Sequence, residues 1–284
     1  MKLATACAFL CALCATATFA QDKSLSCWPW PDSMEATIAA PRDHKILYQD
    51  PNIRFLEVTN PPGNPIHMHT HPLSSVFLTI EPQPRGRDHK SDGSATAPGG
   101  QLPSTANFPI VTANGPQGLH SYEDLDTFPK HFYRVEFKKI PFVCPAQANG
   151  ELAARKTAVT TDPNFLKTSG TLVSTDQAIA SPKTDRILVD RADLRLIEVT
   201  IPPGATETIA TNDWPSALVF YEHQPKGTDT FSDGHVVQVS RRFEGALFPT
   251  AIRMGPQPAH SFHNTDTFPA HFYRVEFKKI QFKG

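Results

Sequence analysis

The segment DTFPKHFYRVEFKKI at residues 126–140 returns as DTFPAHFYRVEFKKI at residues 266–280, with a single substitution. The similarity extends towards the N-terminus, where KILYQDPNIRFLEVTNPPG at 45–63 matches RILVDRADLRLIEVTIPPG at 186–204. The offset between the two copies is 140 to 141 residues. Because similarity at a fixed period indicates a duplicated structural unit, we predict two copies of one domain.

Apolar residues within each copy alternate with polar ones instead of recurring at helical spacing. In the repeated segment, Tyr133, Val135 and Phe137 alternate with Arg134 and Glu136. A period of two predicts a half-buried strand. Short alternating runs separated by Pro-Pro-Gly and Ser-Asp-Gly turns therefore predict an all-β fold, with one antiparallel sandwich or barrel in each copy.

The repeat also sets the expected domain boundaries. We expect an N-terminal domain at 27–145 and a C-terminal domain at 181–284. Residues 146–180 between them are polar, rich in Thr, Ala and Ser, and have no counterpart of similar apolar pattern. They are predicted to form a linker.

One strand in each copy is apolar on a second face as well. After the first histidines this face carries Val76, Leu78 and Ile80, and the second copy repeats it with Ala217 and Val219. Apolar residues on both faces of a strand predict that both are covered. We expect these outer faces to pack against the partner domain or against another subunit, as in a homodimer.

Composition narrows the class of protein. The chain has 284 residues, of which 39% are hydrophobic and 19% charged, as in ordinary soluble globular proteins. The 27 prolines favour turns over long helices. A net charge of -1 provides no excess of positive charge to neutralise a phosphate backbone, so we do not expect nucleic acid as a partner.

The first 20 residues, MKLATACAFLCALCATATFA, have the features of a secretory signal peptide: Lys2, a short apolar run and small residues at the end. The run is shorter than the roughly 20 residues of a membrane span. We therefore predict cleavage after Ala20 and a secreted or periplasmic protein without a membrane anchor. Cys27 and Cys144 then remain, and in an oxidising compartment we expect them to form a disulfide; two buried free thiols are the alternative.

The segment GNPIHMHTHPLSSV at 63–76 contains the most informative polar residues. Successive side chains of a strand point to opposite faces, so His67, His69 and His71 would share one face, and neighbouring members can converge on one metal ion. Alternate histidines alone are a weak signal, because such a stripe is often only a solvated polar patch.

These residues resemble the first motif of the cupin superfamily, with Gly63 followed after five residues by His69 and then by His71. The segment NGPQGLHSYED resembles the second motif through Gly118 and His120, although its spacing is one residue short. The resemblance covers nearly all of the mature chain. It implies two tandem cupin-type, jelly-roll-like β-barrels.

In the first barrel the resemblance implies that His69, His71 and His120 are metal ligands. The glutamate of the family pattern should fall at Ser75 or Val76 and is absent, which puts in doubt any activity built on two histidines and a carboxylate. His67 is a candidate fourth ligand by strand parity alone.

The second copy has lost most of this set. Thr208, Ala210 and Asn212 stand where the first copy has its three alternate histidines. His260, which matches His120, is therefore expected to be structural, and the metal site of the C-terminal barrel is expected to be degenerate. We also interpret His131 and its repeat as fold residues, since both copies keep them.

Two aromatic residues are candidates to line the pocket of the first barrel by strand parity. We favour a core position for Phe77, while Tyr133 stays open between core and pocket, where it could donate a hydrogen bond.

The predicted cofactor is one divalent transition metal: Fe, Mn, Zn, Ni or Cu. Imidazole suits such ions, while the shortage of carboxylates argues against Mg and Ca. The expected function is an exported metal-binding protein of two cupin domains, with a small molecule as ligand or substrate. The resemblance leaves a metal-dependent enzyme open, of dioxygenase-like or lyase or isomerase type acting on a small oxygen-rich molecule. The alternative is a non-catalytic protein that holds a small molecule or a metal.

Overall fold

The computed structural model describes residues 28–63, 65–140, 176–240, 243 and 248–282. The expected leader, Cys27, Cys144 and residues 146–175 of the expected linker lie outside these residues, so export, the disulfide and most of the linker stay predictions. Among the helices in the described residues, none is long and apolar enough to span a membrane.

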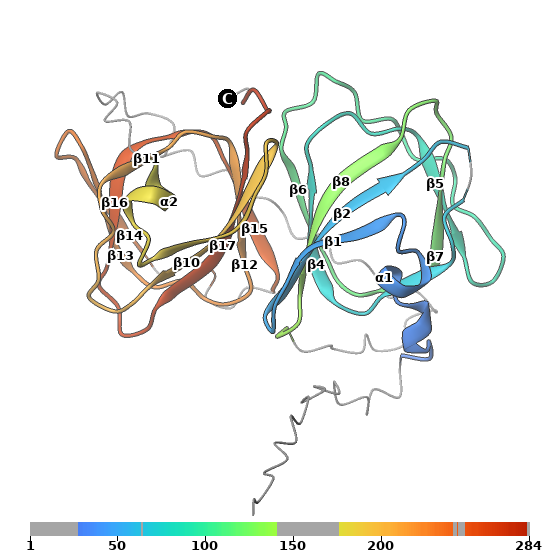
Figure 1. Ribbon diagram of the computed structural model, residues 1–284, viewed down its shortest axis with the longest axis horizontal. Coiled ribbons are helices and arrows are strands. Elements are labelled where there is room, and N and C mark those ends of the chain that lie inside the picture. The colour runs from blue at the N-terminus through green and yellow to red at the C-terminus, as the bar shows by residue number, and fades with distance from the viewer. Residues whose placement is uncertain (1–27, 64, 141–175, 241–242, 244–247, 283–284) are drawn as a thin grey trace, which may run out of the picture.

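The first repeat forms two antiparallel sheets that face each other as the two sides of a barrel (Figure 1). A five-stranded sheet has the order β1-β2-β8-β4-β6, and a three-stranded sheet has the order β3-β7-β5. Their bounds are β1 His44–Gln49, β2 Ile53–Asn60, β3 His69–His71, β4 Ser74–Thr79, β5 Gly86–Lys90, β6 Ile110–Asn114, β7 Gln117–Asp124 and β8 Lys130–Phe137. A short helical segment precedes them, comprising η1 Asp32–Met34 and α1 Ala36–Ala39.

The second repeat has the same strand order with one additional edge strand. Its sheets are β15-β12-β17-β10-β9 and β11-β16-β13-β14. The bounds are α2 Gln177–Ala180, β9 Asp185–Asp190, β10 Leu194–Ile201, β11 Ala210–Asn212, β12 Ser216–Phe220, β13 Gly227–Phe231, β14 Val236–Val239, β15 Thr250–Met254, β16 Gln257–Asn264 and β17 Ala270–Phe277. The prediction of an all-β chain with two tandem, jelly-roll-like β-barrels is thereby confirmed. Helix α2 repeats α1 and occupies the end of the expected linker.

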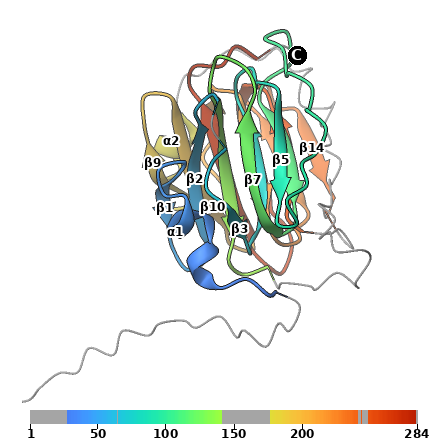
Figure 2. The ribbon, with the colours of Figure 1, turned by 90° about the vertical axis from the view of Figure 1, so that its right-hand side faces the viewer.

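The two barrels lie side by side and share one hydrophobic core, formed where their five-stranded sheets meet (Figure 1). Members from the first barrel include Val76, Leu78, Tyr133, Val135 and Phe137, and members from the second include Ala217, Val219, Tyr273, Val275 and Phe277. Of the two partners expected for the outer apolar faces, the structure shows the other domain. In Figure 2 the three-stranded sheet faces the viewer, on the side away from the second barrel.

The prediction that the repeated strand is half-buried is wrong. Arg134 and Glu136 on β8 are 1% and 0% exposed, although their apolar neighbours already face the other domain. The polar side of the strand faces the inside of its own barrel instead of solvent. In each barrel the outer face of the five-stranded sheet is therefore apolar, and charged side chains lie inside the barrel.

Candidate metal centre

Four histidines from three strands meet inside the first barrel. His69 and His71 form the ends of β3, which pairs with β7 so that His69 lies opposite His120. The register shifts between His69 and His71, so the two are not evenly paired with the neighbouring strand. His44 comes from the first position of β1, on the opposite sheet. The two-sheet architecture thus joins segments that are far apart in the sequence.

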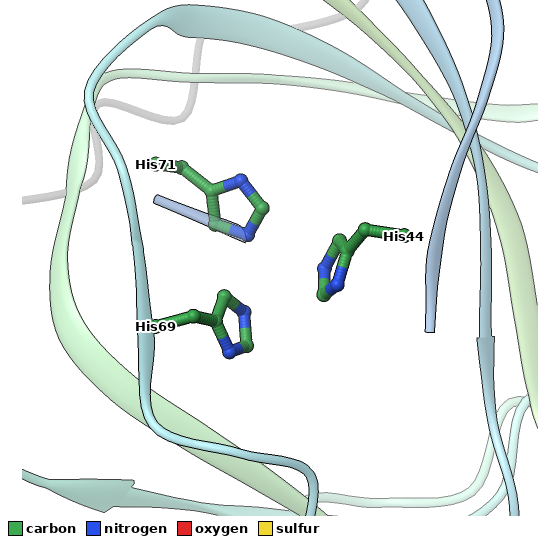
Figure 3. Close-up of side chains that lie close together, drawn as sticks. All are labelled: His44, His69 and His71. Carbon is green, nitrogen blue, oxygen red and sulfur yellow. The ribbon is translucent and has the colours of Figure 1, made fainter. Parts of the chain in front are cut away.

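The rings of these histidines are within contact distance of one another. Ring centroids of His69 and His120 are 4.6 Å apart, and those of His71 and His120 are 5.6 Å apart. His44 lies 4.6 Å from His69 and 5.0 Å from His71, with all three rings converging on one space (Figure 3). In this triad each residue offers one ligand nitrogen, and these nitrogens lie within 4.8 Å of one another. The triad contains the expected ligands His69 and His71 but has His44 in place of the expected His120.

Each of the four rings has its Nδ1 atom against an oxygen acceptor. The contacts are His44 to the Ala40 carbonyl at 3.3 Å, His69 to the His67 carbonyl at 2.7 Å, His71 to Glu136 Oε1 at 3.1 Å and His120 to the Gly118 carbonyl at 2.7 Å. A carbonyl or carboxylate only accepts, so Nδ1 carries the hydrogen and donates it. The lone pair is then on Nε2, which is the arrangement typical of metal-ligating histidines.

The cluster holds neutral imidazoles. Burial lowers the pKa of His44 to about 3 and that of His69 to about 2. Burial also lowers the pKa of His71 well below its ordinary value and lowers that of His120. Positive charge on any of the rings is further disfavoured by the guanidinium of Arg134. All four rings therefore keep a free lone pair at neutral pH, as metal binding requires.

A buried carboxylate network supports the cluster from one side. Besides accepting from His71, Glu136 accepts from Arg54 Nε at 2.6 Å, and Arg54 Nη2 donates to Glu35 Oε1 at 2.5 Å. Glu35, His71 and Glu136 also lie close enough together to hold an ion. Both carboxylates, however, are already ion-paired with Arg54. Their contacts orient and polarise the imidazole of His71.

The structure places the remaining expected site residues as follows. His67 is exposed on the segment before β3 and is not part of the triad of converging nitrogens. Its contact with the site is the backbone carbonyl that accepts from His69 Nδ1. Ser75 is fully buried on β4, and its hydroxyl has no hydrogen-bond partner within the described parts of the chain. Val76 points to the other domain. Glu136 lies opposite Ser75 on the adjacent strand, but it contacts the Nδ1 side of His71 and pairs with Arg54.

The aromatic and outer histidine residues have structural contacts. Tyr133 belongs to the core between the barrels and donates to Asp193 Oδ2 at 2.7 Å. Phe77 packs on Phe132 in a small core cluster, as favoured. His131 is 2.6 Å from Glu81 Oε1, in keeping with a role in the fold.

Sequence reasoning missed His44 and Glu136. The sequence contained a signal for His44. The residues that follow it, 45–63, closely match 186–204, yet the position of His44 itself is Asp185 in the second copy, so His44 is another histidine that only the first copy has. Glu136 gave no such signal, because the second copy repeats it as Glu276.

Comparison with known proteins gives matches only among solved structures. No protein-family model matches the chain, and no curated protein matches it. A cupin domain from Bordetella pertussis is 14% identical over 33% of this chain and 91% of its own, with a TM-score of 0.27. YhaK from Escherichia coli is 13% identical over 86% and 97%, with a TM-score of 0.27. A salicylate 1,2-dioxygenase from Pseudoaminobacter salicylatoxidans, solved as adducts with gentisate, is 11% identical over 81% and 69%, with a TM-score of 0.24. At these values the function has to be argued from the side chains of this chain.

Proposed function

We propose that the protein is an exported two-domain cupin whose first barrel binds one divalent transition metal and uses it on a small oxygen-rich molecule. The observation that supports this most directly is the set of four imidazoles inside the first barrel, of which His44, His69 and His71 are buried and His120 is half-buried. Each has Nδ1 held by an acceptor and Nε2 left open. Export rests on the leader-like sequence at residues 1–20.

The donor set fits a transition metal. Nitrogen ligands bind such ions at about 2.1 Å, so tetrahedral ligand atoms lie roughly 3.4 Å apart, a small adjustment for nitrogens already within 4.8 Å. His44, His69 and His71 would hold the ion, with His120 beside them. Imidazole nitrogen without a directly converging carboxylate suits Fe, Mn, Zn, Ni or Cu better than Mg or Ca.

A divalent ion held by neutral imidazoles supplies Lewis acidity and, if redox-active, electrons for oxygen chemistry. The surrounding chain would bind and orient the substrate. The Ser75 hydroxyl and Arg134 Nη2 are buried on adjacent strands and lack hydrogen-bond partners among the residues the structure covers. Both can donate to a substrate oxygen, and the fixed charge of Arg134 favours an oxygen that becomes negative during the reaction.

The number of imidazoles that bind decides between catalysis and storage. Three protein ligands leave a coordination position for substrate or water, whereas four close a tetrahedral site. The ring of His120 lies as near to that of His69 as the ring of His44 does, so His120 is the candidate for a fourth ligand. A site closed by four imidazoles would support the second candidate function, a non-catalytic metal-binding protein. Coordination number is therefore the property that separates the two.

The test is elemental analysis of protein purified without chelator or nickel column, followed by X-ray absorption spectroscopy at the metal found. We expect one metal per chain, lost in His69→Ala and in His71→Ala and kept in His260→Ala, the second-barrel control. Three nitrogen ligands plus an oxygen, with oxygen consumption or turnover of an added substrate, support the enzyme. Four nitrogens without turnover support the metal-binding protein. Unchanged metal content in His69→Ala contradicts both.

A further inference from the structure

The second barrel contains a cavity of about 100 Å³ at the place that corresponds to the histidine cluster of the first. Much of its wall is apolar and includes Val199, Leu218, Phe220 and Phe272. One water needs at least roughly 10 to 15 Å³ of such space, so the cavity has room for many more atoms than a single water. Such a cavity is large enough for one small ring compound.

Buried polar groups face this cavity without partners. Asn212, Gln257 and Arg274 line it and are 3%, 5% and 7% exposed. Asn212 Nδ2, Gln257 Oε1, Arg274 Nε and Arg274 Nη1 have no hydrogen-bond partner in the described segments. Since leaving a buried polar group without a hydrogen bond destabilises the fold, such a concentration of them indicates a ligand or ordered water.

One hydrogen bond of the first barrel is missing from the second. There Arg134 Nη1 donates to Gln117 Oε1 at 2.7 Å. Arg274 and Gln257 occupy the same two positions, yet the matching nitrogen and oxygen are both unpaired in the part of the chain that the structure describes. The residues are the same, and only the first barrel has closed the contact.

The charges around the cavity disfavour an anionic ligand. Arg274 is opposed by Asp185 and Glu276. Burial, followed by the neighbouring Asp185, raises the pKa of Glu207 to about 8, so at neutral pH Glu207 keeps a proton next to Asp185. An anion would meet these carboxyl groups, whereas a hydroxyl group can both donate to Gln257 or Asp185 and accept from Arg274.

We propose that the C-terminal barrel is a metal-independent binding site for an uncharged polyhydroxylated ring, a monosaccharide or a cyclic polyol. Open donors and acceptors together match hydroxyl groups, and the rings of Phe220 and Phe272 match the apolar C–H faces of such a compound. The site goes beyond the metal chemistry proposed for the first barrel and does not depend on it.

The experiment is isothermal titration of the full chain with D-xylose, D-glucose and myo-inositol, each up to tens of millimolar. We expect at least one of them to bind one per chain. Gln257→Leu and Asn212→Ala should each weaken that binding by about tenfold or more, since each removes a hydrogen bond to the ligand. Gln117→Leu, the same change in the first barrel, should leave it unaltered. Circular dichroism and thermal unfolding verify that the variants are folded.

Three results would overturn the proposal. One is that none of the three compounds binds to the folded wild-type protein. Another is that benzoate or ethylammonium binds in their place: benzoate would contradict the argument against an anion, and ethylammonium would contradict the proposal of an uncharged ligand. The last is that Gln257→Leu and Asn212→Ala bind the ring compound as well as the wild type does. Metal content, measured on the same samples, reports separately on the function proposed for the first barrel.

Discussion

Replacing His44 is the most direct test of the metal centre, because the sequence motif does not contain it. His44 is 4% exposed and its ring lies 4.6 Å from that of His69. His67 is a candidate ligand by strand parity alone and is exposed. If geometry determines the ligands, His44→Ala will lose metal affinity and His67→Ala will keep it.

The magnitude follows from linkage between binding and folding. A metal present at about 100 times its dissociation constant stabilises the folded state by about 2.7 kcal/mol. If loss of one imidazole weakens binding about 100-fold, that gain falls to about 0.4 kcal/mol. For a protein of this size the metal-induced rise in melting temperature would drop from about 5 to 11 °C to about 1 °C.

The assay is differential scanning calorimetry of chelator-treated protein with and without added zinc. Each variant is compared with its own metal-free form, so that any destabilisation by the missing His44 ring cancels. The His67→Ala protein should show the full wild-type rise. An equal rise in His44→Ala and wild type would refute the ligand role of His44, and loss of the rise in His67→Ala would show that the exposed histidine binds after all.

Three further predictions concern the surroundings of the site. Glu136→Gln should lower metal affinity about 10- to 100-fold by weakening the contact with His71, which competition with a chromogenic chelator measures. It should also cost roughly 3 to 5 kcal/mol of stability in urea unfolding, because it leaves buried guanidinium charge uncompensated. Unchanged metal affinity would contradict the role of the Glu136–His71 contact. Tyr133→Phe should cost about 1.5 kcal/mol in urea unfolding by removing the hydrogen bond to Asp193, whereas a neutral result would mean that water replaces it. Folding raises the pKa of Glu207 from an ordinary value near 4.5 to about 8, so its stabilising contribution is complete below pH 4.5 and is lost as pH rises through 8. The free energy of unfolding should accordingly decline between pH 5 and 8 less steeply in Glu207→Gln than in wild type, and equal slopes would exclude this residue as the source.

The fold could be predicted because the information was local and repeated. Alternation and turn residues define the strands, and the duplication shows that the pattern describes a domain. The outer faces of β4 and β12 also gave the contact between the barrels, since a strand that is apolar on its second face has to be covered.

The site could be predicted only where its residues lie within a motif. His69, His71 and His120 sit on two paired strands, and the structure brings their rings together. His44 arrives from the opposite sheet, 25 positions before His69, and no spacing rule connects the two. Glu136 stayed on the polar side of a strand predicted to be half-buried, because alternation gives the two sides of a strand but not which side faces the inside of a barrel.

The shared core between the barrels restricts how the two halves can change. Severing the chain between them would leave each half with a water-exposed apolar sheet, including Tyr133 and Val135 on one side and Tyr273 and Val275 on the other, and would favour aggregation or self-pairing. The nearly identical segments 126–140 and 266–280 each contribute one strand to this shared surface. Most side chains inside the two barrels take no part in this contact, so the two interiors can differ in chemistry: His69 and His71 of the first barrel correspond to Ala210 and Asn212 of the second.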